Sequence, residues 1–339
     1  MASWFTRLRC AALGAAAAMS ACTAAATAPP SPSRSHLATP GPYPTAAAVP
    51  VAATSLSGSA PLIVQVENSP ASRPQSGLDS AAIVYEYVAE GGVGRFSAMF
   101  VTPPPVRVGP VRSARLVTIV LLKLYAGVLA YSGGSHFIEG QLSASGRPHF
   151  NETAAGGDLF RIDSRSAPHN LYSDGAHLAD LLNRSRAAPI GYSYFSPLAA
   201  SDAGNAAAAF SVPISAQEVP RWTWSAPLHG WTRAEPDTGA LVDANSGAPV
   251  VATTVVVQQV PIAISPDVID VNGVHGVIHT ITGGGRAQVF VGGREYDASW
   301  SQPAAGPPAF TLANGQPAPM APGLVWVELV ATGTPARLG

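Results

Sequence analysis

Two arginines stand beside a tight turn in the first half of the sequence, in a pattern that suits anion binding. Arg112 and Arg115 follow Gly109 and Pro110, a pair that favours a turn, and a predicted helix opens at Ser113. The N-terminus of a helix has free N–H groups and partial positive charge, so two arginines there are unfavourable unless an anion lies beside them. We therefore expect a carboxylate or another anion at this turn.

That anion can come from inside the protein or from outside it. Glu86 and Glu90 are the internal candidates, because they lie in and just after a predicted strand before the turn. An external ligand would be held by the arginines and by N–H groups near Ser113. Arg95 supplies a third arginine, so three arginines face two glutamates. This excess favours an external anion for at least one arginine.

A second polar stretch offers a candidate base. His169 and Asn170 follow Asp163, and Asp163 could orient His169 for proton transfer. The sequence has no Gly-x-Ser-x-Gly motif, so a hydrolase triad has little support. We count His169 and Asn170 as ligand-binding candidates. The rival interpretation is a hydrolase that uses His169 with Glu86 or Glu90.

Metal and cofactor motifs are missing from the sequence. The histidines lack zinc-type spacing, and no calcium loop occurs. His275 and His279 are four residues apart, but in a β-rich stretch rather than on a helix. The glycines 283–285 are flanked by predicted strands, so they indicate a hairpin or bulge rather than a phosphate loop. We expect no metal and no cofactor.

Composition narrows the class of protein. The 339 residues carry 19 Lys+Arg against 20 Asp+Glu, for a formal net charge of -1. A near-neutral chain argues against nucleic acid as a partner, because such binding depends on positive charge. The length suits two domains rather than one.

The N-terminal residues have the layout of an export signal. Arg7 and Arg9 precede an apolar run, 10–19, which is too short to span a bilayer. The run leads into small residues and Cys22, which resembles a bacterial lipobox, and both cysteines of the sequence lie in this leader. We therefore predict a signal peptide over 1–21 and lipidation of Cys22, which anchors an exported, extracytoplasmic protein to the bacterial membrane. An ordinary cleaved signal peptide is the alternative.

The remaining chain divides by composition into a tether and two domains. Residues 22–60 are rich in Ala, Pro, Ser and Thr, which predicts a disordered tether. Alternating strands and helices predict an α/β domain over 61–200, and an alanine-rich linker is expected over 201–219. Short strands separated by turn residues predict a smaller β-rich domain over 220–332. The expected strands are 62–66, 83–88, 96–101, 128–131, 222–224, 253–260, 274–281, 287–291 and 325–330, and the expected helices are 113–125 and 173–186.

Several of these segments together resemble the YerB-like family of bacterial lipoproteins. The resemblance covers nearly everything from Pro61 to Val330 and is most specific at residues 109–115. The segments that carry it are Arg73-Pro74-Gln75-Ser76-Gly77, Glu90-Gly91-Gly92, Gly109-Pro110-Val111-Arg112-Ser113-Ala114-Arg115, Ala167-Pro168-His169-Asn170-Leu171-Tyr172 and Pro322-Gly323-Leu324-Val325-Trp326. The resemblance implies an exported, membrane-anchored protein with two domains of unknown function, and it supplies no catalytic residues.

These observations predict an extracytoplasmic lipoprotein that binds a polar or anionic ligand of the cell envelope. A hydrolase and a scaffold that docks an envelope protein are the two rivals. A binder predicts arginines that face an open site, whereas an enzyme predicts paired groups with pKa values driven apart by burial. A scaffold predicts an exposed apolar patch on the β-rich domain.

Overall fold

The computed structural model of the chain describes residues 60–104, 106–188, 204–235, 238–270, 272–303 and 306–339. The chain divides into two units, Met1–Tyr43 and Pro44–Gly339, and every described residue belongs to the second. The predicted signal peptide (1–21), Cys22 and the tether up to residue 59 lie outside the described residues.

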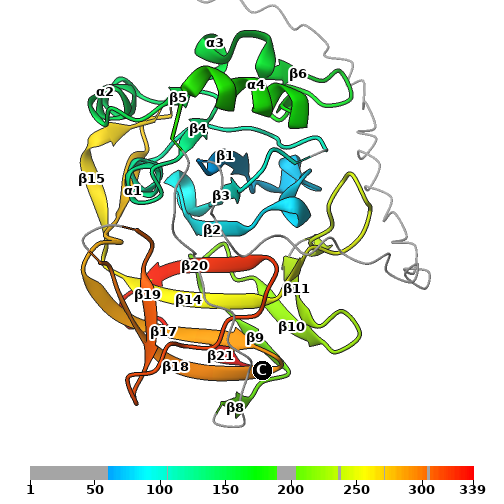
Figure 1. Cartoon of the computed structure of the whole chain (residues 1–339), viewed down its shortest axis with the longest axis vertical. Coiled ribbons are helices and arrows are strands. Elements are labelled where there is room, and N and C mark those ends of the chain that lie inside the picture. Colours follow the sequence, from blue (N-terminus) through cyan, green and yellow to red (C-terminus); the bar gives the residue numbers. More distant parts are fainter. Residues whose placement is uncertain (1–59, 105, 189–203, 236–237, 271, 304–305) are drawn as a thin grey trace, which may run out of the picture. The chain divides into compact units, whose positions relative to one another are not determined.

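One sheet of eleven strands runs through the described part of the chain (Figure 1). In spatial order its strands are β19 (Ala309–Leu312), β18 (Arg294–Ser301), β17 (Gly284–Val291), β14 (Thr254–Val260), β20 (Val325–Ala331), β2 (Ile83–Val88), β3 (Gly94–Phe100), β1 (Leu62–Glu67), β4 (Val128–Ala130) and β5 (His149–Phe150), with β8 (Asn205–Ala206) beside β18. The glycines at 284 and 285 begin strand β17 rather than a phosphate loop, as their β surroundings predicted.

The centre of this sheet joins the two sequence regions expected to form separate domains. Strand β2 pairs in parallel with β20, in a register that runs from Ile83 opposite Val325 to Tyr87 opposite Leu329. Parallel pairing needs a long connection, and here that connection is most of the chain. The N-terminal and C-terminal regions therefore share one sheet.

A second sheet covers part of one face of the first. Its strands are β12 (Gly239–Ala240), β11 (Gly230–Glu235), β10 (Arg221–Ser225), β9 (Ala209–Ser211) and β21 (Arg337–Leu338), with β13 (Val251–Ala252) beside β11. Phe210 of β9 stacks on Phe290 of the large sheet with ring centroids 3.6 Å apart. The described part of the expected linker, 204–219, thus contains strands β8 and β9. Its few apolar side chains, among them Phe210 and Val212, are buried, and this burial favours an ordered structure.

Four α-helices are described, and all lie in the N-terminal region. They are α1 (Leu116–Leu124), α2 (His136–Ala144), α3 (Glu152–Ala155) and α4 (Gly175–Ser185), and short 3-10 turns occur at η1 (Pro70–Ser72), η2 (Leu78–Ser80), η3 (Glu90–Gly92) and η4 (Gly156–Asp158). The sequence analysis missed α2, whose interior contains Gly140. Its signal was Ser135, which accepts a hydrogen bond from the N–H of Ile138 as an N-cap.

The predicted start of α1 at Ser113 lies three residues before the first helical residue. The N-cap is Arg115, with extended backbone, and Leu116 is the first helical residue. The reason is tertiary, because Arg112 donates its backbone N–H to Gln65 of β1 and Ala114 donates to Gly133. These bonds keep the segment extended until Arg115.

The α/β class predicted for 61–200 is not confirmed, because the described structure is mostly β. Two smaller two-stranded sheets add to the strands, β15 (Ile262–Ile269) with β16 (His275–His279) and β6 (Phe160–Arg161) with β7 (Leu171–Tyr172). Many strand pairs of the large sheet are antiparallel, and the helices are short. Apolar side chains fill both faces of the large sheet, with Val64, Phe96 and Trp326 on one and Ile63, Tyr85 and Leu122 on the other.

Within the described residues, no helix is long and apolar enough to cross a membrane.

Candidate anion-binding site

Strand register brings Arg95 to the face of the sheet that α1 covers. Arg95 of β3 lies opposite Glu67 of β1 and Tyr87 of β2. Side chains alternate between the two faces of a strand, so residues in register share a face. The hydroxyl of Tyr87 lies 3.3 Å from that of Thr118 in α1, which identifies the shared face.

The chain before α1 carries Arg112 and Arg115 to the same place. The backbone of Arg112 is bonded to β1, and Arg115 caps the helix. Burial lowers the pKa of Arg95, and the nearby charges of Arg115 and Arg112 lower it further. Arg95, Arg112 and Arg115, which the sequence grouped around one turn, therefore lie near one another in the structure.

Glu67 is an acidic centre of this cluster that the sequence analysis did not select. Its Oε2 atom lies 3.3 Å from Arg112 Nε and 2.9 Å from His169 Nδ1, and its Oε1 atom accepts a hydrogen bond from Ser69. A carboxylate can only accept, so His169 Nδ1 carries the proton of that contact. Strand alternation from Gln65 was the available signal, because it places Glu67 on the face of Arg95.

Glu90 is the internal partner of Arg115, as one of the two predicted pairings proposed. Arg115 Nε forms an ion pair with Glu90 Oε2, and Arg115 Nη1 donates to the carbonyl oxygens of Ser113 and Ala114. The hydroxyls of Ser113 and Ser132 lie 3.3 Å apart. Ser113 thus lies at the edge of the cluster without capping the helix.

Among the described residues, Arg95 differs from its two neighbours in having no direct ion pair, although the charge of Glu67 on the adjacent strand acts on it. It is 5% exposed, and its Nε and Nη1 atoms are buried without a hydrogen bond among the described residues. Burial, together with the charges of Arg115 and Arg112, lowers the pKa of Arg95 to about 9. A buried guanidinium without a direct ion pair is unfavourable, so an added anion beside Arg95 would be stabilising.

Glu86 does not join the arginine cluster. It lies opposite Phe96, one residue out of phase with Arg95, and so it points to the other face of the sheet. There it accepts hydrogen bonds from Arg233 Nε at 3.2 Å and from Trp326 Nε1 at 3.0 Å. These partners of Glu86 could not be predicted from the sequence, because Arg233 and Trp326 are distant from Glu86 in the chain.

The second cluster around Glu86 is a buried carboxylate network. Arg233 also pairs with Glu235 and, at 3.2 Å, with Glu218, while Glu328 accepts from Trp222 at 2.9 Å. Arg73 approaches the same group, 3.5 Å from Glu218 and 3.2 Å from Glu235. Burial raises the pKa of Glu86 well above its usual value, that of Glu218 to about 8 and that of Glu328 to about 7. Because this network has four carboxyls and only two guanidiniums, some of its carboxyls keep their protons near neutral pH.

The hydrolase constellation of His169 with Glu86 or Glu90 is not assembled. His169 pairs with Glu67, and Asp163 is not its partner. The Asn170 side chain accepts from Arg161 and donates to the carbonyl of Ile162, so it serves its own loop rather than the arginine cluster.

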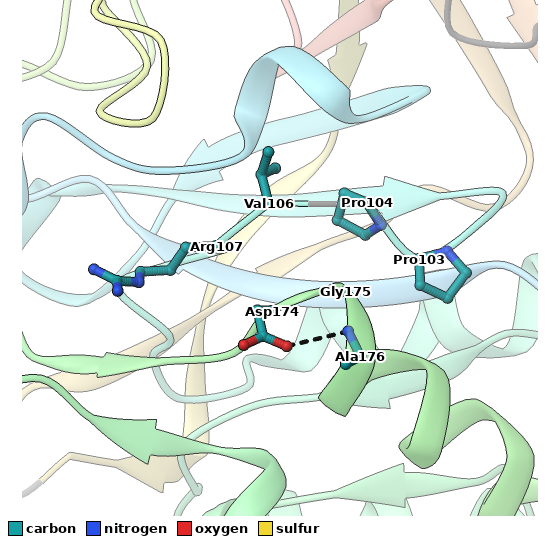
Figure 2. Close-up of a pocket in the computed structure, with 7 residues that line it drawn as sticks. All are labelled: Pro103, Pro104, Val106, Arg107, Asp174, Gly175 and Ala176. Atoms are coloured by element: carbon teal, nitrogen blue, oxygen red, sulfur yellow. Dashed lines mark hydrogen bonds between the residues drawn. The ribbon is translucent and has the colours of Figure 1, made fainter.

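A cavity of about 460 Å³ lies away from all of these residues. It is bounded by Pro103, Pro104 and Arg107 on one side and by the start of α4 on the other (Figure 2). Asp174 accepts hydrogen bonds from the N–H groups of Ala176 and His177, so the helix N-terminus at this cavity is already capped. Among the described residues, no group of three or more His, Cys, Asp and Glu side chains is arranged to hold a metal ion.

Comparison with known proteins identifies relatives over most of the chain. Family models described as the N-terminal and C-terminal domains of DUF3048, a protein of unknown function, match residues 47–188 and 210–327. The Bacillus subtilis (strain 168) protein YerB, named as a candidate lipoprotein, is 28% identical over 281 residues, which is 80% of this chain and 81% of YerB. The crystal structure of YerB from Bacillus subtilis has a TM-score of 0.69 and 25% identity, covering 81% of this chain and 92% of that one. The resemblance predicted from the sequence motifs is confirmed.

Proposed function

The chain belongs to the DUF3048 family of YerB-like proteins, and we propose that it is an exported, lipid-anchored protein that binds an anionic ligand of the cell envelope. The lipobox-like residues at Cys22 and the name of the Bacillus subtilis relative support the anchored, extracytoplasmic location. The arginine cluster, defined as Arg95, Arg112 and Arg115, supports anion binding.

The observation that carries this proposal is the unpaired guanidinium of Arg95. The cluster holds three arginines against Glu67 and Glu90, which leaves one positive charge in excess. That charge is buried, whereas the side chains of Arg112 and Arg115 are 26% and 18% exposed. A solvent anion would therefore meet the cluster first at the partly exposed Arg112 and Arg115.

Thermal unfolding with and without added anions tests the proposal. A ligand that binds only the folded state raises its stability as the ligand concentration rises above Kd. We expect at least one small anion to raise the Tm of the full chain at constant ionic strength, and Arg95→Met to abolish that rise. Arg337→Met, at an exposed position on β21, is the matched control and should keep it. A Tm rise of equal size in Arg95→Met would contradict the proposal.

A scaffold function is the second candidate, because the β15–β16 hairpin exposes apolar side chains. Ile264 is 66% exposed, Ile269 48% and Val274 38%. Such clustering on one hairpin is typical of a protein contact. A photoreactive residue at position 264, with position 337 as the control, tests this by crosslinking in cells. A specific adduct from position 264 alone would support docking, and its absence would count against it.

A further inference from the structure

We infer that the arginine cluster accepts a phosphate group, as a tetrahedral oxyanion, in preference to a carboxylate. This inference rests on the proposed function and names the ligand class of the same site. It follows from which guanidinium donors the protein uses internally and which it leaves open.

The internal contacts use only some of the guanidinium donors of Arg112 and Arg115. Arg112 meets Glu67 through Nε, and Arg115 meets Glu90 through Nε and the chain through Nη1. Among the described residues, no partner bonds Nη1 or Nη2 of Arg112, or Nη2 of Arg115. Arg95 leaves Nε and Nη1 without a hydrogen-bond partner in the described part of the chain. Each of the three arginines thus keeps at least one open donor.

These open donors come from different directions. Arg95 rises from strand β3, Arg112 lies in the extended segment before α1, and Arg115 is the cap of that helix. The two oxygens of a carboxylate lie in one plane and are satisfied by a single guanidinium fork. A phosphate presents three or four oxygens in a tetrahedral arrangement, which can engage three guanidiniums at once.

The charge of the site agrees with this assignment. The three arginines outnumber the two glutamates that pair with them directly, which leaves the guanidinium of Arg95 without a direct ion pair. A phosphate monoester carries between one and two negative charges at neutral pH. The hydroxyls of Ser113 and Ser132 lie at the edge of the cluster and can donate to further oxygens.

Titration calorimetry of the full chain at pH 7.5 and constant ionic strength separates phosphate from carboxylate. Inorganic phosphate is the probe, acetate is the planar comparison, and malonate supplies two negative charges without tetrahedral geometry. We expect phosphate to bind at least about tenfold more tightly than either carboxylate. Equal or tighter binding of malonate would overturn the phosphate assignment and leave the proposed anion site standing. Absence of binding by all three anions would overturn both.

Two variants link any binding to this site. Arg112→Lys keeps the positive charge but removes the open guanidinium donors, so we expect phosphate to bind about tenfold more weakly. Arg95→Met should abolish binding, whereas Arg337→Met should leave it unchanged. Unaltered phosphate affinity in Arg112→Lys would place the ion elsewhere and refute the inference, even if Arg95→Met did not fold.

The phosphate can belong to a free ester or to a lipid headgroup, and vesicles distinguish these sources. The full chain carrying Cys22→Ser, which removes the predicted anchor, is sedimented with phosphatidylcholine vesicles that contain phosphatidic acid. Sedimentation that inorganic phosphate reverses supports a lipid phosphate. Phosphate binding without sedimentation supports a soluble phosphorylated ligand. Sedimentation that persists in Arg95→Met shows that the vesicles bind another surface and excludes the lipid as the ligand of this site.

Discussion

Glu86 of β2 and Glu328 of β20 lie directly opposite each other in adjacent parallel strands, and both are fully buried. Like charges in register across a sheet repel each other. Arg233 neutralises part of this charge, but burial still raises the pKa of both carboxyls. The contact between the N-terminal and C-terminal regions therefore holds at least one proton.

Protons held on Glu218 and Glu328 make the stability of the folded protein fall as pH rises. Burial and the neighbouring Glu86 raise the pKa of Glu218 to about 8, and burial raises that of Glu328 to about 7, from an ordinary value of 4.5. The folded protein then binds more protons than the unfolded chain, so the stabilisation is complete below pH 4.5 and lost as pH rises through 7 to 8. We expect the free energy of unfolding to fall by about 2 kcal/mol between pH 6.5 and 8.5. Urea unfolding across this range measures it.

The variant Glu218→Gln tests whether Glu218 causes the fall in the free energy of unfolding between pH 6.5 and 8.5. The amide oxygen can still accept from Asn68 and Arg233, while the titrating group is gone. We expect most of the loss between pH 6.5 and 8.5 to disappear in this variant. Glu152→Gln, which changes a partly buried carboxylate on α3 paired with Arg161, is the reference variant. A slope that survives in Glu218→Gln would show that other groups hold the proton.

Arg233 should be indispensable to the same contact. Arg233→Met leaves several buried carboxyls without their main counter-ion, and breaking a buried ion pair from one side costs about 3–5 kcal/mol. Chemical denaturation at pH 7 measures the loss. The double variant Arg233→Met/Glu86→Gln should recover part of it, because one unpaired carboxyl is removed. A loss no larger than that of Arg337→Met would mean that the network contributes little.

Substitution of Arg95 should have the opposite effect on stability from substitution of Arg233. It is buried without a direct ion pair, so Arg95→Met should stabilise the ligand-free protein by about 1–3 kcal/mol while removing anion binding. Arg112→Ala should instead destabilise, because it removes the arginine that pairs with the buried carboxylate of Glu67 and leaves only His169 and Ser69 in contact with it. Thermal unfolding of both variants in anion-free buffer makes the comparison. Destabilisation by Arg95→Met would assign Arg95 a structural role.

Cys22 should carry the lipid anchor. The apolar leader ends in small residues before Cys22, and the mature chain would have no other cysteine. Cys22→Ser should release the protein from membranes, because several acyl chains are needed for firm anchoring. Mass spectrometry of the N-terminal peptide detects the modification. An unmodified Cys22, or cleavage at another position, would refute the prediction.

The two family regions should stay together after the chain between them is cut. Strands β2 and β20 pair over five residues, and Glu86 and Arg233 form a buried ion pair across the same contact. A protease site inserted between residues 200 and 204 should yield two fragments that elute together in gel filtration without denaturant. Two separately eluting, folded fragments would show that each region is independent.

The sequence by itself determined the local elements and the family of this protein. Short runs rich in apolar and β-branched residues predicted strands β1, β2, β14 and β20 to within about two residues, because the preference of such side chains for strands acts locally. The turn at Gly109 and Pro110 and the arginines around it were sufficient to locate a charged cluster. The start of helix α1, by contrast, depends on hydrogen bonds between the preceding segment and β1, and its predicted position was wrong.

Only the tertiary structure decided which charges meet. Glu86 and Arg95 are close in sequence, yet they lie on opposite faces of the sheet because their positions in neighbouring strands are out of register by one residue. Glu86 instead meets Trp326, 240 residues later, because β2 pairs with β20. Strand neighbours are chosen by burial of the whole sheet rather than by local propensity. The partner of each buried carboxyl was therefore fixed only when the strands assembled.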